Sequence, residues 1–232
     1  MSLVYYAIGD IHGEADRLIE LHQIIKDWHA ALYPNRQSKL VHLGDYIDRG
    51  PKSYNVIQTL IDLEKKNPEI SICLQGNHEE LMLNAYNKTG QDAYRNWQNN
   101  GGEQTLESYR RNGFDDVPAF HLKWLGSLES YYWDRVAKLI FVHAGIDPVH
   151  FPNDGKDRHL WTRSAKFFDT ARWNNSLPSG TKVIHGHTPT QSGQPDIDGD
   201  YQRINVDTGA CYGGDLTAVV LAQGENPRFL KV

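Results

Sequence analysis

Cysteine is scarce in this sequence. Among its 232 residues only Cys73 and Cys211 occur, and neither belongs to a Cys-x-x-Cys pair, so neither a disulfide framework nor a thiolate metal site is indicated. Long apolar runs are also missing, which excludes a membrane-spanning helix, and the N-terminus lacks the pattern of a signal peptide. We therefore expect a soluble, cytoplasmic protein with no membrane partner, whose cysteines are reduced and structural.

An excess of positive charge is absent as well. The formal net charge is -5 and the isoelectric point is near 6.1, which disfavours polymeric nucleic acid as a partner. Low-complexity tracts are missing, and 39% of the residues are hydrophobic, as is typical of an ordered globular chain. A chain of this length can bury one substantial core, so we predict a single domain over residues 1–232.

The first third of the chain alternates between strand and helix. Short apolar runs at Leu3–Ile8, Leu40–Leu43 and Ile70–Leu74 have the composition of buried strands. Each run is followed by apolar residues at helical spacing. Three consecutive strand-helix units predict parallel strands joined by right-handed crossovers.

The rest of the chain has a different pattern. Residues 89–132 are expected to form a mostly helical, aromatic-rich insertion, and residues 147–179 a long loop with a short helix near 165–173. Further strands are expected at Lys138–Val142, Lys182–His185, Arg203–Val206 and Leu216–Ala222. The last two are close enough in sequence to pair antiparallel. We therefore predict an α/β protein with two mixed sheets packed face to face.

Polar side chains follow the expected strands at their carboxyl ends. The first three strands end in Gly9-Asp10-Ile11-His12, Gly44-Asp45 and Gly76-Asn77-His78, and two later strands end at His143 and at His185 or His187. Ligands of open α/β sheets bind at these strand ends, so the five segments should converge on one edge. Each short motif alone recurs by chance, but five in this arrangement indicate a site.

These side chains suit divalent metal ions. Carboxylate, amide oxygen and neutral imidazole, without thiolate, are ligands of manganese, iron or zinc. Asp10 and His12 are separated by one residue. In an extended chain their side chains therefore point the same way and can reach one ion. A pair of ions needs a bridging carboxylate, for which Asp45 is the candidate.

Taken in chain order, the motifs resemble those of the phosphoprotein phosphatase branch of the calcineurin-like metallophosphoesterases. The resemblance covers nearly the whole chain, and it is strongest to compact bacterial and phage Ser/Thr phosphatases and diadenosine tetraphosphatase-like relatives. It implies a four-layer α/β/β/α sandwich of two mixed sheets flanked by helices. The segments that carry it are Asp10-x-His12, Gly44-Asp45-x-x-Asp48-Arg49-Gly50, Gly76-Asn77-His78-Glu79, Asn100-Gly101-Gly102, His143-Ala144-Gly145, Gly186-His187-Thr188 and Asp207-Thr208-Gly209-Ala210.

The resemblance also implies roles for individual residues. His187, which follows Gly and precedes Thr, matches the family's ligand, whereas His185 does not. His78 is the implied general acid, and Asp48 orients it. The implied ligands of two divalent ions, of which manganese is preferred and iron, zinc or cobalt are possible, are Asp10, His12, Asp45, Asn77, His143 and His187. The implied phosphate-binding residues are Arg49, Asn77 and Arg163.

The resemblance implies hydrolysis of phosphate esters by a metal-bound hydroxide. Phosphomonoesters, such as phosphoserine and phosphothreonine in proteins, are favoured because Asp48 is present where relatives that cleave diadenosine tetraphosphate symmetrically commonly carry Ala. Dinucleoside polyphosphates are the alternative substrate, and a non-catalytic metal-binding scaffold is a further alternative. The aromatic insertion either covers the site or forms core.

Overall fold

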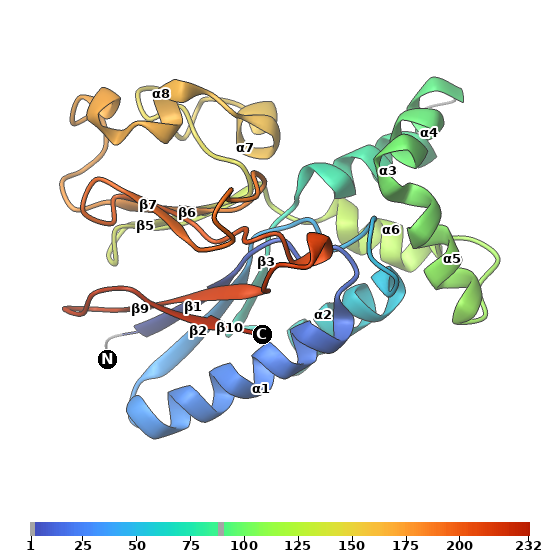
Figure 1. Cartoon of the computed structure of the whole chain (residues 1–232), viewed down its shortest axis with the longest axis horizontal. Coiled ribbons are helices and arrows are strands. Elements are labelled where there is room, and N and C mark those ends of the chain that lie inside the picture. Colours follow the sequence, from blue (N-terminus) through green and yellow to red (C-terminus); the bar gives the residue numbers. More distant parts are fainter. Residues whose placement is uncertain (1–2, 88–90) are drawn as a thin grey trace.

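The computed structural model describes residues 3–87 and 91–232, which form two five-stranded sheets packed face to face (Figure 1). The first sheet has the order β10-β9-β1-β2-β3, with strands at Arg228–Lys231, Thr217–Ala222, Leu3–Ile8, Gln37–His42 and Ser71–Cys73. The second has the order β4-β5-β6-β8-β7, with strands at Tyr131–Asp134, Leu139–Val142, Lys182–His185, Arg203–Asn205 and Asp196–Asp198.

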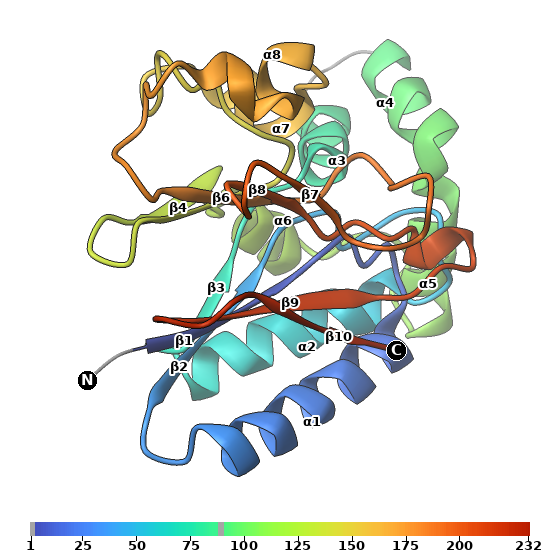
Figure 2. The same cartoon turned by 60° about the vertical axis from the view of Figure 1, so that its left-hand side comes forward.

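The first sheet is buried on both faces, and successive residues of its strands point to opposite faces. In β1, Val4, Tyr6 and Ile8 pack toward helices α1 (Ala15–Leu32) and α2 (Ser53–Lys66), whereas Tyr5 and Ala7 face the other sheet. Both helices lie against the outer face of this sheet in Figures 1 and 2. The two helices therefore form one outer layer.

The second sheet is covered on its outer face by α7 (Lys156–Trp161) and α8 (Ala165–Phe168), as Figure 2 shows. The 3-10 turn η2 (Thr170–Trp173) packs on the same face through Trp173. Ile140 and Val183 pack beneath Phe167 and Trp173, whereas Phe141 faces the first sheet. The predicted α/β/β/α sandwich of mixed sheets is thus confirmed.

The helical segment near the end of the first sheet contains α3 (Asn77–Asn87), α4 (Gln91–Trp97), the π-helical turn η1 (Gln98–Gly102), α5 (Glu103–Arg111) and α6 (Ala119–Gly126). The predicted insertion at 89–132 is mostly helical where it is described, but residues 88–90 lie outside the described part, and Tyr131 already belongs to strand β4. Its large aromatics are partly core, because Trp97 and Tyr109 are fully buried.

Strands β1, β2 and β3 pair parallel, as their strand-helix repeats predict. The expected antiparallel pairing of Arg203–Val206 with Leu216–Ala222 is wrong. β8 pairs with β6 and β7 in the second sheet, and β9 pairs with β1 and β10 in the first. Residues 206–216 instead cross between the sheets and contain η3 (Ala210–Tyr212). No helix among the described residues is long and apolar enough to cross a membrane.

Candidate active site

Five strand ends bring the predicted ligands to one edge of the sandwich. Asp10 and His12 follow β1, Asp45 follows β2, and Asn77 begins α3 just after β3. His143 follows β5 and His187 follows β6 in the second sheet. All six side chains are buried. The site is therefore built by both sheets, with Asp45 contributed by the end of β2 in the first.

Two groups of buried side chains could each hold a cation. The first contains His12, Asp45 and His78, and the second contains Asp45, His143 and His187, with ligand atoms within 4.8 Å of one another in each group. The two carboxylate oxygens of Asp45 serve different groups. Oδ2 lies 3.4 Å from His12 Nε2, and Oδ1 lies 3.4 Å from His143 Nε2. This placement suits a carboxylate that bridges two divalent ions.

Asn77 and Asp10 complete the surroundings of these groups. Asn77 Oδ1 lies 2.8 Å from both His143 Nε2 and His187 Nδ1. Asp10 accepts the backbone N–H of His187, at 3.0 Å from its Oδ1. A side chain at Gly186 would place its Cβ 2.1 Å from that oxygen, so glycine is required there. Asp10 is thus fixed beside both groups, although it belongs to neither.

The imidazoles are held in the neutral form that binds metal. His12 Nδ1 lies 2.7 Å from the carbonyl oxygen of Ile47, and His143 Nδ1 lies 3.0 Å from that of Leu43. Nδ1 donates in both contacts, so each neutral ring presents an unprotonated Nε2 to Asp45. Burial lowers the pKa of His12 and of His187 to about 3 and also lowers the pKa of His143.

The carboxylates of the site are crowded. Burial and the charges of Asp207 and Asp45 raise the pKa of Asp10, and burial raises the pKa of Asp207 to about 7. Burial opposes ionisation of Asp45 too, but His143, His78 and His12 hold its pKa below its usual value. Asp207 Oδ2 is buried without a hydrogen-bond partner in the described part of the chain. Divalent cations would offset this repulsion, and the donor set fits them.

The loops that carry these residues have an unusual backbone. His12, Asp45, Asp48, Arg49 and His187 adopt positive φ values of 43°, 53°, 69°, 67° and 69°. Non-glycine residues rarely occupy this region, and they persist there only when surrounding contacts enforce it. Five such residues gather around the predicted ligands, where the surrounding contacts hold their backbone in place.

Glu79 supplies one of those enforcing contacts. Its Oε2 accepts the backbone N–H groups of Asp45 at 2.9 Å and Gly76 at 2.8 Å, and its Oε1 accepts that of Tyr46 at 2.8 Å. Its side chain is buried, and burial raises its pKa to about 8. Glu79 belongs to one of the motifs that carry the family resemblance, but the motif implies no role for it. No pattern in the sequence predicts that this side chain accepts hydrogen bonds from the backbone of the turn at Asp45 and Tyr46.

His78 and Asp48 form a buried pair beside the two groups. His78 Nδ1 lies 2.7 Å from Asp48 Oδ2. Asp48 also accepts hydrogen bonds on Oδ1 from Trp97 Nε1 at 3.0 Å and Thr105 Oγ1 at 2.7 Å. Burial would lower the pKa of His78, but Asp45 and Asp48 raise it above its usual value. The insertion thus supports Asp48 through Trp97 and Thr105.

A pocket of about 320 Å³ opens onto these residues. Arg49 Nη1 lies 2.7 Å from His12 Nε2, and Arg163 Nε donates to His187 Nε2 at 3.2 Å, so each arginine touches one group. The lining consists of Asp45, Arg49, Asn77, His78, Asn100, Trp161, Arg163 and His187. We call the two groups of potential metal ligands together the cluster. The predicted residues Arg49 and Arg163 lie where an anion above the cluster would meet both guanidinium groups.

His185 lies apart from the site. Its Nε2 contacts Arg203 Nη1 at 3.1 Å, and its ring packs edge-on against Phe167, 4.9 Å between centroids. It is fully buried among these residues. After strand β6, it is the side chain of His187 that enters the site.

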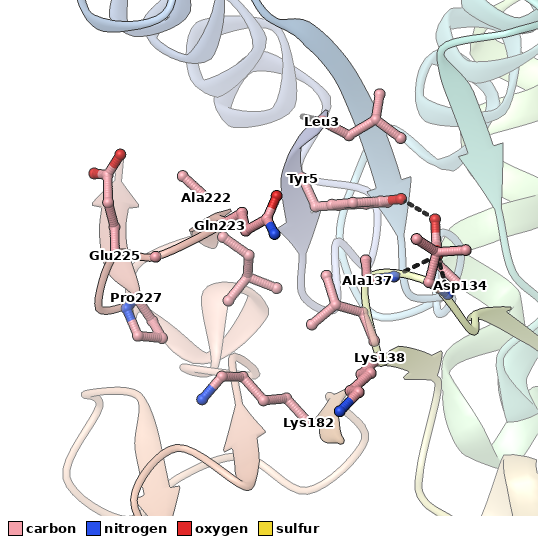
Figure 3. A pocket seen from close by; sticks show the side chains of 14 residues that line it. Leu3, Tyr5, Asp134, Ala137, Lys138, Lys182, Ala222, Gln223, Glu225 and Pro227 are labelled. Atoms are coloured by element: carbon pink, nitrogen blue, oxygen red, sulfur yellow. Dashed lines mark hydrogen bonds between the residues drawn. The ribbon is translucent and has the colours of Figure 1, made fainter. Parts of the chain in front are cut away.

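A wider cavity of about 540 Å³ lies at the opposite end of the sheets (Figure 3). It is lined by the start of β1, the end of β9 and the turns beside β5 and β10, including Tyr5, Lys138 and Lys182. Tyr5 donates a hydrogen bond to Asp134 there. Neither group of potential metal ligands found among the described residues lies at this end.

The sequence profile of the calcineurin-like phosphoesterases matches residues 3–220, which is nearly the whole chain and includes every residue of both metal groups. The chain belongs to the calcineurin-like phosphoesterase family. The buried His/Asp groups of this phosphoesterase are suited to divalent metal.

Relatives and solved structures agree with this assignment. The phosphoesterase is 30% identical over 232 residues to an asymmetrical bis(5'-nucleosyl)-tetraphosphatase, PrpE, of Oceanobacillus iheyensis, with 91% of this chain and 86% of the relative covered. It is 26% identical to PrpE of Geobacillus sp. (strain WCH70), with 91% and 87% covered.

The fold is similar to that of solved metallophosphoesterases and phosphatases. A protein serine/threonine phosphatase from Saccharomyces cerevisiae superposes with a TM-score of 0.65 at 15% identity, covering 99% of this chain and 79% of that one. A metallophosphoesterase from Sphaerobacter thermophilus gives a TM-score of 0.56 at 17% identity, covering 100% and 88%. At these identities the likeness concerns the fold.

Proposed function

We propose that this phosphoesterase hydrolyses dinucleoside tetraphosphates with the help of two divalent ions. The observation that carries the reaction is the double group of buried ligands that shares Asp45, with one arginine at each side. The substrate is supported by the relatives, which are named asymmetrical tetraphosphatases and match over most of their length. We further propose that residues 1–232 act as one domain.

The proposed ligands are Asp10, His12 and Asp45 for one ion, and Asp45, Asn77, His143 and His187 for the other. When bound, two such ions supply Lewis acidity, which lowers the pKa of water and neutralises charge on the phosphoryl group. Oxygen and neutral nitrogen donors are compatible with manganese, our first choice, and with iron, zinc or cobalt.

The proposed phosphate-binding residues are Arg49, Arg163 and Asn77, which all line the pocket. A planar guanidinium group can donate two parallel hydrogen bonds to phosphate oxygens, so the two arginines fix the orientation of the substrate. Because they touch different groups, they meet the phosphate oxygens of the substrate from two sides.

His78 is the proposed general acid. Its Nδ1 is engaged by Asp48, which leaves its Nε2 proton for the leaving oxygen. Trp97 and Thr105 keep the Asp48 carboxylate in place, so the imidazole stays oriented between turnovers.

Phosphoserine or phosphothreonine proteins are the second candidate substrates. The observation that favours them is the intact Asp48–His78 pair at 2.7 Å. An alkoxide is a poor leaving group and needs a proton, whereas a nucleotide phosphate leaves readily without one. An enzyme restricted to anhydrides has less use for this pair.

A comparison of two substrates tests the proposal. Manganese-loaded protein is incubated with diadenosine tetraphosphate or with a phosphothreonine peptide, and kcat/KM is determined for each. We expect faster cleavage of the tetraphosphate, with AMP and ATP as products of asymmetrical cleavage. Faster turnover of the peptide would establish the second candidate, and turnover of neither would contradict both.

A further inference from the structure

Four aromatic side chains are exposed in the described part of the chain, namely Tyr94, Phe120, Trp161 and Tyr212. A single exposed aromatic is ordinary on a protein surface. Trp161 and Tyr212 differ from the other two because each lies next to an arginine that contacts a group of potential metal ligands. Trp161 lies near Arg163, and Tyr212 lies near Arg49.

Trp161 lies at the end of α7 and is 40% exposed. It lines the catalytic pocket together with Arg163, and its ring centroid is 6.3 Å from that of His187. The indole is fixed in place, because Nε1 donates to Glu80 Oε2 at 2.7 Å. A neighbouring cavity of about 480 Å³ shares Trp161 and Arg163 with the pocket. Trp161 therefore borders a second opening beside the pocket.

Tyr212 occupies the corresponding place beside Arg49. It ends the turn η3, which is flanked by Gly209 and Gly213 with positive φ values of 77° and 88°. Arg49 Cζ lies 5.5 Å from the ring centroid, so the guanidinium group covers one face. The side chain is 64% exposed, which leaves the remainder of the ring accessible.

The two arginine–aromatic pairs lie at opposite ends of the cluster. Arg49 contacts His12, which belongs to the first group, and Arg163 contacts His187, which belongs to the second. Asp45 is shared by both groups and thus lies between them. An anionic chain that crosses Asp45 would meet an arginine on each side and an aromatic ring beside each arginine.

A dinucleoside polyphosphate has this same order of chemical groups, with a base at each end of an anionic chain. Resting on the proposed function, we infer that Trp161 and Tyr212 are the two platforms on which the bases stack, with the polyphosphate held between Arg163 and Arg49. Stacking on an aromatic ring accepts any base, because every base has a π-face. The pair therefore selects for two nucleosides rather than for one particular base.

The test compares a substrate that has two bases with one that has none. For each protein, kcat/KM is measured with manganese on diadenosine tetraphosphate and on p-nitrophenyl phosphate, and the ratio of the two values is the readout. The variants are Trp161→Ala, Tyr212→Ala and the double variant, with Trp161→Phe and Tyr212→Phe as conservative partners. Phe120→Ala removes an exposed aromatic outside the pocket and serves as the matched control.

We expect the ratio to fall at least about fivefold in each alanine variant, since stacking contributes roughly 1–3 kcal/mol per base. The falls should multiply in the double variant, because the two rings bind different ends of the substrate. Both phenylalanine variants and Phe120→Ala should keep the wild-type ratio. A protein that has merely lost folded material loses both activities in parallel, so its ratio does not move.

Two results separate the inference from the function on which it rests. Wild-type protein that does not cleave diadenosine tetraphosphate would contradict the proposed function. Wild-type protein that cleaves it, with an unchanged ratio in both alanine variants, would overturn the stacking role alone. The stacking role is also overturned if the phenylalanine variants lose as much selectivity as the alanine variants.

Discussion

The two ends of the sheet sandwich differ in chemistry. The end at which β1, β2 and β3 terminate has a pocket of about 320 Å³ over buried carboxylates and imidazoles. The other end has a wider cavity of about 540 Å³ with lysines and apolar side chains. The smaller opening is the one we propose as the active site, because polar groups converge there on residues with positive φ. Cavity size alone would have pointed to the other end.

Of the substitutions that compare the two ends, removal of the shared carboxylate should lower activity the most. We expect Asp45→Asn to lower kcat by at least about 10³-fold, since both groups of ligands lose the charge they share. Lys182→Gln, a change at the opposite cavity, should leave kcat within about twofold of wild type. Steady-state kinetics with saturating manganese measures both. Equal losses in the two variants would remove the distinction between the ends.

The general acid should matter most for poor leaving groups. His78→Asn should slow hydrolysis of an alkyl phosphate by about 10²-fold or more, and that of p-nitrophenyl phosphate much less, because only the alkoxide needs a proton. The measured quantity is kcat on the two esters under identical conditions. If the variant slows both esters equally, His78 acts in some other way than by proton donation.

Glu79 should affect folding before chemistry. Glu79→Ala leaves three buried backbone N–H groups without their acceptor, so we expect the free energy of unfolding to fall by about 3 kcal/mol. Glu79→Gln retains one acceptor oxygen and should lose less. Urea denaturation measures the difference. An unchanged midpoint in Glu79→Ala would show that the turn holds its shape without this residue.

The smallest effect is expected at the far end of the sandwich. Tyr5→Phe removes the hydroxyl that donates to Asp134 and should lower the free energy of unfolding by about 1 kcal/mol, with kcat unchanged. Thermal unfolding and kinetics on the same preparation measure both quantities. A loss of activity larger than that of His78→Asn would place functional chemistry at this end after all.

The sequence predicted which side chains lie close together better than it predicted which strands pair. Apolar runs ending in Gly-Asp or Gly-Asn place the ligands at strand ends, and this pattern is local. The sequence pattern implies no role for Asp207, whose buried carboxyl lies beside Asp10. Its proximity depends on how residues 206–216 cross between sheets. Which sheet a strand joins is set by packing of the whole chain.

The strands that were not predicted are short and lie at sheet edges. β4, β7 and β10 contain four, three and four residues, and β7 is mostly exposed, so an apolar alternation is not available to mark them. The helix α7 was included in an expected loop because it has only six residues. It nevertheless carries Trp161 toward the pocket, and Arg163 follows it closely.

The most direct test of the account is the number of metal ions bound per chain. Protein is stripped with a chelator, loaded with manganese, desalted and analysed by elemental mass spectrometry, for wild type, Asp45→Asn and Lys182→Gln. Two ions are expected in wild type and in Lys182→Gln, and one or none in Asp45→Asn, because only Asp45 belongs to both groups. Wild-type protein that binds no ion, or an Asp45→Asn variant that retains two, would contradict a binuclear centre built on this residue.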